Sequence, residues 1–284
     1  MRRGSWALLA VLLAAGCGGD DEPAEAPAVL AIEATEPGPG RYRLVVPESV
    51  EAGVVELRLR NSGRERHEVQ LLRLDDDHTV EEALRVVSAE DGKIPDWFHA
   101  AGGVGATAPG ALARATVELE EGRYHLVDTG SGEGERSFAQ GGAVAALTVT
   151  EGDGSGELPE AAGEIEMQDY GFEATGLRPG VNTLTLRNTG DELHHTVVVP
   201  IAGDASIEAV RTFLTSDEPP SGSPPVDFRT ATATAVLDGG LAQTAQLDLK
   251  AGRYAFVCFI TDRAGGPPHV EKGMLAEVLV PTED

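Results

Sequence analysis

The sequence predicts an all-β protein built from two tandem β-sandwiches, each with one short helix inserted. Its 284 residues suit two domains of ordinary size, and an apolar content of 41% is enough for folded cores. Short runs of Val, Thr and Leu alternate with turns drawn from 35 glycines and 17 prolines. The third observation is that the second half of the chain repeats the pattern of the first.

The N-terminus has the features of a targeting segment. Arg2 and Arg3 precede an apolar stretch at 6–15, which is too short for a bilayer that needs about 20 residues. Residues 1–16 are therefore predicted to be a signal peptide. The residues before Cys17 resemble the lipobox of bacterial lipoproteins, which implies lipidation of Cys17 and a membrane-anchored, extracytoplasmic protein. The alternative is plain secretion, with Cys17 discarded or free. Residues 17–28 are acidic and suit a flexible tether.

The charge balance is strongly acidic. The chain carries 22 basic and 47 acidic residues, a formal net charge of −25, and the signal peptide takes away two arginines and no acid. Such a charge opposes binding to nucleic acid and to anionic lipid surfaces. We therefore expect no nucleic-acid partner, and we interpret the acidic residues as a solvated surface.

The repeat defines the elements in order. "VEAGVVELRLRNSGRERHEVQLLRL" at 50–74 parallels "LRPGVNTLTLRNTGDELHHTVVVPI" at 177–201, and in each a histidine follows six residues after an Asn-Ser/Thr-Gly asparagine. A helix is predicted next in each copy: "TVEEALRVV", with Thr79 and Glu82 at capping-box spacing, and "SIEAVRTFL" from Ser206. The strands at 108–128 and 237–258 also correspond. These matches predict domains at 29–150 and 164–281, joined by a Gly- and Glu-rich linker at 151–163.

The second copy carries adjacent histidines, and strand geometry allows only one of them to face the interior. In the first copy His67, Val69 and Leu71 form the apolar face, while Glu68 and Gln70 are expected to face water. The aligned inward positions are His194, Thr196 and Val198. His194 is therefore preferred as a ligand, with His195 as the alternative.

The last loop supplies further candidate ligands. A strand ends at Cys258, which has no disulfide partner if Cys17 is lipidated. His269 and Met274 follow in a C-x10-H-x4-M pattern. A thiolate, two imidazoles and a thioether form the soft nitrogen-and-sulfur set that suits copper.

These residues resemble the ligand pattern of the cupredoxin (blue-copper) family, in which an early histidine joins Cys, His and Met from the last loop. The resemblance implies a Greek-key β-sandwich with a type 1 copper ion that alternates between Cu(I) and Cu(II). It further implies one-electron transfer with a transient redox partner. By the same resemblance, His269 lies nearest the surface, within an apolar docking patch of Pro267, Pro268 and Val270.

The first copy lacks most of this set. Alignment places Asp128 at the Cys258 position, Phe138 at that of His269 and Ala143 at that of Met274. Only His67 remains, and it is expected to be a buried histidine bonded to backbone. The first domain is thus predicted to be a degenerate cupredoxin-like domain without a blue-copper site.

Three functions remain open from the sequence. The leading hypothesis is a lipid-anchored one-electron carrier; the others are copper binding or delivery without a redox partner, and a metal-free interaction module. No hydrolase, phosphate-binding or CxxC motif is present. Seven histidines spread in this way do not supply the extra copper sites of nitrite reductases or multicopper oxidases, so we expect no catalytic activity.

Overall fold

The computed structural model describes residues 27–75, 77–89, 92–132, 136–152, 156–216 and 222–282. The predicted signal peptide, the lipidation site at Cys17 and most of the tether lie outside these residues. Among the helices that are described, none is long and apolar enough to cross a membrane.

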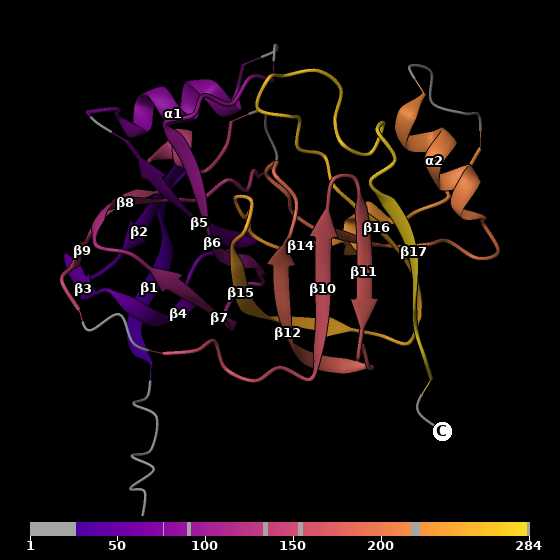
Figure 1. Cartoon of the computed structure of the whole chain (residues 1–284), viewed down its shortest axis with the longest axis horizontal. Coiled ribbons are helices and arrows are strands. Elements are labelled where there is room, and N and C mark those ends of the chain that lie inside the picture. Colours follow the sequence, from indigo (N-terminus) through magenta and orange to yellow (C-terminus); the bar gives the residue numbers. More distant parts are fainter. Residues whose placement is uncertain are drawn as a thin grey trace, which may run out of the picture.

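Nine strands and one α-helix make up the first half of the described chain (Figure 1). In order they are β1 (Ala28–Gly38), β2 (Arg41–Val45), β3 (Ser49–Glu51), β4 (Gly53–Asn61), β5 (His67–Leu74), α1 (Val80–Val87), β6 (Phe98–Thr107), β7 (Leu112–Leu119), β8 (Gly122–Val127), the 3-10 turn η1 (Ala139–Gly141) and β9 (Val144–Thr150).

The second half has eight strands and one α-helix. They are β10 (Gly163–Gln168), β11 (Gly171–Thr175), β12 (Gly180–Asn188), β13 (Val197–Pro200), α2 (Ile207–Thr215), the 3-10 turn η2 (Phe228–Thr230), β14 (Thr232–Ala233), β15 (Ala242–Leu249), β16 (Gly252–Val257) and β17 (Leu275–Val280).

The strands form three sheets, which confirms the all-β prediction. A five-stranded sheet, β3-β9-β8-β5-β6, belongs to the first half, and a four-stranded sheet, β14-β13-β16-β17, belongs to the second. The third sheet runs through both halves in the order β11-β10-β12-β15-β7-β4-β1-β2. Its two halves join where β15 pairs antiparallel with β7, at Gln243↔Val117 and its neighbours. The two sandwiches therefore share one continuous sheet.

The interior is also continuous. One cluster of buried side chains includes Leu57 of β4 and Leu71 of β5 from the first half, together with Leu186 of β12 and Phe256 of β16 from the second. Burying such side chains is the main favourable contribution to folding. The two sandwiches are thus packed against each other as well as hydrogen-bonded.

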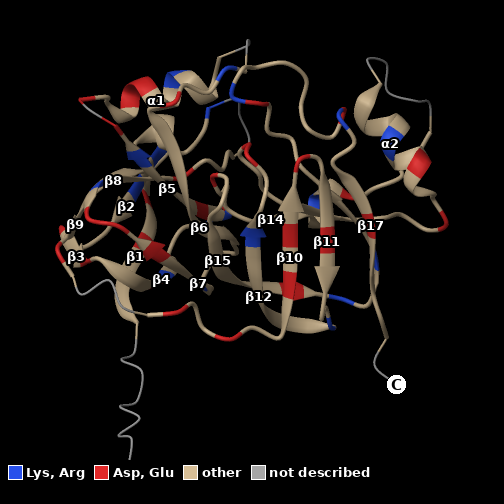
Figure 2. Cartoon of the chain, in the orientation of Figure 1, with Lys and Arg blue, Asp and Glu red and all other residues tan. Residues whose placement is uncertain are grey.

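Both predicted helices are present, and each begins at the expected cap. The Thr79 hydroxyl accepts the Glu82 N–H, and the Glu82 carboxylate accepts the Thr79 N–H at 2.8 Å, which completes a capping box for α1. The Ser206 hydroxyl accepts the Ala209 N–H at the start of α2. Acidic residues are scattered over loops and strands of both halves and do not gather on one element (Figure 2).

Candidate metal centre

Strand pairing brings the candidate ligands together. Cys258 comes directly after β16, and β16 pairs with β13 through Val257↔Val197, three residues after His194. His269 lies in the loop between β16 and β17, where its N–H donates to the Ile260 carbonyl at 2.8 Å. His194, Cys258 and His269 all have exposed fractions of 0%. Three residues distant in sequence thus share one buried pocket.

The three side chains point their ligand atoms at one centre. Cys258 Sγ lies 3.8 Å from His194 Nδ1 and 3.6 Å from His269 Nδ1. The two Nδ1 atoms are 3.1 Å apart. Within the described part of the chain, this is the only group of three or more His, Cys, Asp or Glu side chains with ligand atoms so close together.

These separations fit a shared metal ion. Thiolate sulfur and imidazole nitrogen bind a metal at about 2.3 Å and about 2.0–2.1 Å. Atoms at those radii, spread around one ion, are separated by distances of the observed size. Two imidazoles and one thiolate are the donor set of type 1 copper. The cluster is therefore positioned and composed for a copper ion.

The outer nitrogen of each imidazole is held by a carboxylate. His194 Nε2 lies 2.6 Å from Asp169 Oδ1, and His269 Nε2 lies 3.1 Å from Asp262 Oδ1. Each Nε2–H donates to its carboxylate, which leaves Nδ1 unprotonated and facing the centre. Such carboxylate–histidine pairs fix the tautomer and orientation of a metal ligand.

The Asn-Thr-Gly turn explains how Asp169 reaches His194. The Asn188 amide donates to the carbonyls of Glu192 at 2.7 Å and Leu237 at 2.9 Å, and its oxygen accepts the Gly190 N–H at 3.0 Å. This turn aims the Asp191 N–H at Asp169 with a distance of 2.9 Å. A Cβ at Gly190 would collide with the Asp169 carboxylate and crowd His194 Nε2. Glycine is needed at this position for the close approach.

His269 is covered by a second set of polar side chains. The Tyr170 hydroxyl donates to Asp262 Oδ1 at 2.9 Å, and Lys272 forms an ion pair with the other Asp262 oxygen. Lys272 Nζ also lies 4.8 Å from the centroid of the Tyr170 ring, which in turn is 4.9 Å from the His269 ring. We call Tyr170, Asp262 and Lys272 the polar cover.

The expected position of His269 at the surface is wrong. His269 is fully buried, and Val270, which was expected in an apolar docking patch, has an exposed fraction of 2%. Pro267 alone of the expected patch is in the exposed class. The physical reason is that Asp262 satisfies the outer imidazole nitrogen, so water is not needed there, and the polar cover fills the space above it.

Burial controls protonation in the cluster. Burial raises the pKa of the Cys258 thiol to about 11. Burial and the neighbouring His194 lower the pKa of His269 to about 4. Burial also lowers the pKa of His194, although Asp169 acts in the opposite direction. Both imidazoles are therefore neutral at pH 7, the form that binds metals, whereas the thiolate needs a nearby cation.

The remaining candidates occupy different places. Met274 is fully buried; its N–H donates to the His269 carbonyl at 2.9 Å and its carbonyl accepts the Cys258 N–H at 3.3 Å. Its role as a fourth ligand stays a prediction. His195 is outside the cluster, because its Nε2 accepts the Phe259 N–H at 3.1 Å and its side chain lines a separate cavity.

The first half holds an ion-pair cluster at the corresponding place. His67 Nδ1 lies 2.5 Å from an oxygen of Asp128, the residue aligned with Cys258, and His67 Nε2 lies 3.3 Å from Glu36 Oε1. The Phe138 ring, aligned with His269, is 4.7 Å from the His67 ring. The expectation that His67 bonds to backbone is therefore wrong: two carboxylates hold it. We call Glu36, His67 and Asp128 the first-half triad.

Sequence reasoning missed the carboxylates of both sites. Glu36 and Asp169 are equivalent, since Ala34 and Met167, two residues earlier, pair with the asparagines Asn61 and Asn188. In the structure, each acid lies two residues beyond the last residue of its strand that pairs with the asparagine strand. Asp262 and Lys272 carry no comparable signal from the repeat, since Gly141 stands at the position aligned with Lys272.

The all-β fold and the buried His–Cys–His cluster resemble those of cupredoxins, and the cluster is arranged for a copper ion. No protein-family profile and no curated protein sequence matches the chain.

Several solved structures are similar to it. An auracyanin from Roseiflexus castenholzii is 16% identical over 43% of this chain and 98% of its own, with a TM-score of 0.30. Auracyanin A of Chloroflexus aurantiacus, a "blue" copper protein, is 15% identical over 43% and 100%, with a TM-score of 0.30. A copper nitrite reductase from Nitrosomonas europaea is 16% identical over 90% and 94%, with a TM-score of 0.26.

Proposed function

We propose that this protein is a lipid-anchored, extracytoplasmic copper protein that carries single electrons, with His194, Cys258, His269 and Met274 as ligands. The observation that carries the proposal is the convergence of two Nδ1 atoms and one Sγ on a single buried centre. When bound there, copper supplies a one-electron couple between Cu(I) and Cu(II). A rigid sandwich that holds the ligands in place keeps the reorganisation between the two states small.

The chain's own residues divide the work around that centre. Asp169 and Asp262 orient the two imidazoles, and the buried walls exclude water from the thiolate. The polar cover lies between His269 and the outside. We therefore place the contact with a redox partner on Tyr170 and Lys272 rather than on the imidazole edge, as a small and transient interface.

Visible absorption of the purified mature chain with Cu(II) tests the proposal. A strong thiolate-to-copper band is expected, and Cys258→Ser should abolish it. His125→Gln, which changes a histidine outside the cluster, should keep the band. Circular dichroism of each variant checks that the fold is retained. A variant without the band but with unchanged circular dichroism locates the thiolate ligand at Cys258.

Met274 has a separate test. Replacing this buried thioether by leucine keeps a similar volume but removes the weak axial donor. We expect Met274→Leu to retain the visible band and to raise the reduction potential, since an apolar axial side favours the less charged Cu(I) complex. An unchanged potential would remove Met274 from the ligand set.

Copper binding or delivery without a redox partner is a second candidate. The complete burial of His269 favours it, because no imidazole edge reaches solvent for direct contact with a partner. The copper-binding test by visible absorption, described above, separates the two functions. Retention of Cu(I) alone, or Cu(II) binding without the visible band, supports copper handling, and absence of binding supports a metal-free interaction module.

A further inference from the structure

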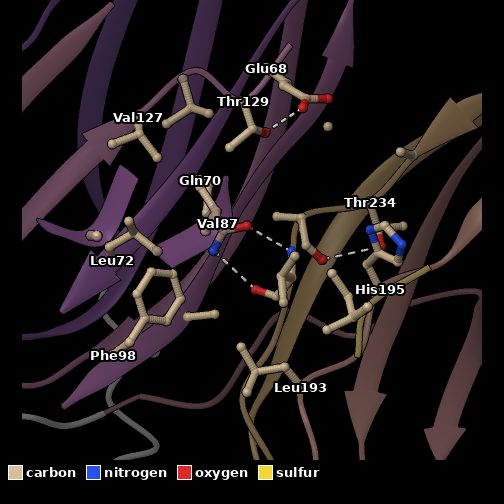
Figure 3. Close-up of a pocket in the computed structure, with 18 of the residues that line it drawn as sticks. Glu68, Gln70, Leu72, Val87, Phe98, Val127, Thr129, Leu193, His195 and Thr234 are labelled. Atoms are coloured by element: carbon tan, nitrogen blue, oxygen red, sulfur yellow. Dashed lines mark hydrogen bonds between the residues drawn. The ribbon is translucent and has the colours of Figure 1, made fainter. Parts of the chain in front are cut away.

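A partly open cavity of about 280 Å³ lies between the two halves (Figure 3), and residues of α1 form part of its wall. Its walls come from β5, β6, β8 and α1 of the first half, and from Leu193, His195, residues 233–236 and Ile260 of the second. It is separate from the cluster of His194, Cys258 and His269. Protein interiors rarely leave voids much larger than a water molecule, so a cavity of this size in a packed interface requires an explanation.

The walls of this cavity are mainly apolar. Leu72, Phe98, Val127 and Leu193 surround it in Figure 3, and all four have exposed fractions of 4% or less. An engineered cavity of about 150 Å³ lined by apolar side chains is large enough for benzene. The present cavity has room for a somewhat larger molecule, such as one substituted ring.

Most polar groups on the wall are already satisfied by the protein. Gln70 donates to the carbonyls of Gly102 at 3.0 Å and Val236 at 3.1 Å, and its oxygen accepts the Val236 N–H at 2.7 Å. The Thr129 hydroxyl donates to the Glu68 carboxylate at 2.5 Å. The bond between Thr129 and Glu68 appears as a dashed line in Figure 3. A ligand in the cavity has no need to replace them.

His195 offers the one directional contact. Its Nε2 accepts the Phe259 N–H, so in the neutral ring the proton is on Nδ1. Nδ1 has no hydrogen-bond partner among the described residues, and the side chain lines the cavity. A ligand with one acceptor atom could receive that hydrogen bond.

Charge excludes the ionic classes of ligand. No Lys or Arg is among the described residues that line the cavity, so nothing there would offset the desolvation of an anion. The only carboxylate on the wall, Glu68, is engaged by Thr129. A cation would have to compete with that bond in an otherwise apolar space.

We propose that this cavity is a binding site for a small neutral molecule of about one substituted ring, mainly apolar and carrying at most one hydrogen-bond acceptor. The site is independent of the copper site in its contacts but adjacent to it in the chain. His195 follows His194, and Phe259 follows Cys258, so occupancy of the cavity touches the backbone that carries two of the three cluster residues.

Calorimetry and methyl NMR of the mature chain test the proposal with toluene, acetophenone and benzoate as probes. We expect saturable one-to-one binding of toluene, tighter binding of acetophenone through its carbonyl acceptor, and binding of benzoate at least about tenfold weaker than acetophenone. The methyl shifts should map to Leu72, Val104, Val127 and Leu193. Neither measurement needs copper. Failure of the cavity proposal is therefore distinct from failure of the proposed electron-transfer function.

Filling the cavity provides the matched comparison. Ala100→Leu and Ala235→Leu add bulk at two lining positions, whereas Ala108→Leu adds the same bulk at an exposed site. We expect toluene affinity to fall by at least about tenfold in the first two and to be unchanged in the third. Equal affinity in the filled variants, equal binding of benzoate, or methyl shifts elsewhere would overturn the proposal. If the filled variants do not fold, the methyl map of the unmodified chain decides alone.

Discussion

Gly190 shows how the absence of a side chain allows Asp169 to approach His194 and hold its ring. Its backbone is not in the left-handed region, so alanine there is costly only through contact with Asp169 and His194. Gly63 has the same relation to Glu36 and His67. The glycine of the Asn-Ser/Thr-Gly pattern is thus explained in both copies by the approach of an acid to a histidine.

We expect Gly190→Ala to displace the Asp169 carboxylate and turn the His194 ring. The unfolding free energy should fall by about 1–3 kcal/mol, the usual cost of inserting a methyl group into a packed site. Copper affinity, measured by competition with a chelator, should fall as well. Gly171→Ala is the control, because its added Cβ would meet only Gln168 at an ordinary 3.7 Å. Equal copper affinity in both variants would contradict the role of Gly190 in placing Asp169 against His194.

The first-half triad makes stability depend on pH. Burial alone would lower the pKa of His67, but Asp128 and Glu36 together raise it above its ordinary value of 6.5. The folded state therefore binds the proton more tightly than the unfolded state. The stabilisation that protonated His67 gives to the folded state is complete below about pH 6.5. It is lost as the pH rises through the higher pKa of His67 in the folded state.

Urea unfolding of the unmodified chain and of His67→Gln between pH 5 and pH 9 measures this effect. The difference in unfolding free energy should be largest at the acid end and shrink as the pH rises. Asp128→Asn should cost about 3 kcal/mol at pH 6, because it leaves the imidazolium with Glu36 alone. A difference that stays constant across the range would mean that His67 is neutral throughout.

At the scale of single elements, the caps of the helices are the most local and most predictable features. Thr79→Ala removes the hydroxyl that accepts the Glu82 N–H at 3.2 Å. We expect the unfolding free energy to fall by about 1 kcal/mol. Thr79→Ser keeps the hydroxyl and should restore most of the loss. Guanidinium denaturation monitored by circular dichroism gives both values, and equal losses would show that the cap contributes nothing.

Sequence patterns predicted the strands and helices better than the contacts between them, because the former depend on neighbouring residues and the latter on residues far apart in the chain. Alternation and capping signals identified the strands and both helices, since each depends on residues within about four positions. The pairing of β15 with β7 joins Gln243 to Val117, and no local pattern encodes such a contact. Gln70 was expected to face water and is instead buried with an exposed fraction of 5%, since the second half covers it.

The candidate site was predictable for the same reason only in part. Cys258, His269 and His194 follow a spacing that strand geometry makes meaningful, and the structure brings them together. The acids around them belong to a set of 47 acidic residues, and no local pattern distinguishes them from the rest. Nothing in the sequence separates Asp262 from those others: its partner Tyr170 comes from a distant segment, and its partner Lys272 is ten residues away in the same loop.

At the scale of the whole molecule, the shared sheet and core predict that the two halves unfold together. Gln70 is one of the side chains that join them, through two hydrogen bonds to Val236. We expect a single calorimetric transition for the mature chain. Gln70→Ala should lower its unfolding free energy by about 1–3 kcal/mol, because the Val236 N–H loses its partner. Gln246→Ala, at an exposed position on β15, is the control. Two separate transitions would show that the halves are independent.

The antiparallel pairing of β7 with β15 has a consequence for any attempt to divide the chain into two fragments. Each fragment would present a bare row of N–H and C=O groups along a strand that the intact protein keeps paired, and such edges recruit other strands. Fragments made separately should therefore oligomerise. Mixed in equal amounts, the two fragments should instead bind each other and restore the native pairing of β7 with β15. Size-exclusion chromatography would reveal this as a one-to-one complex.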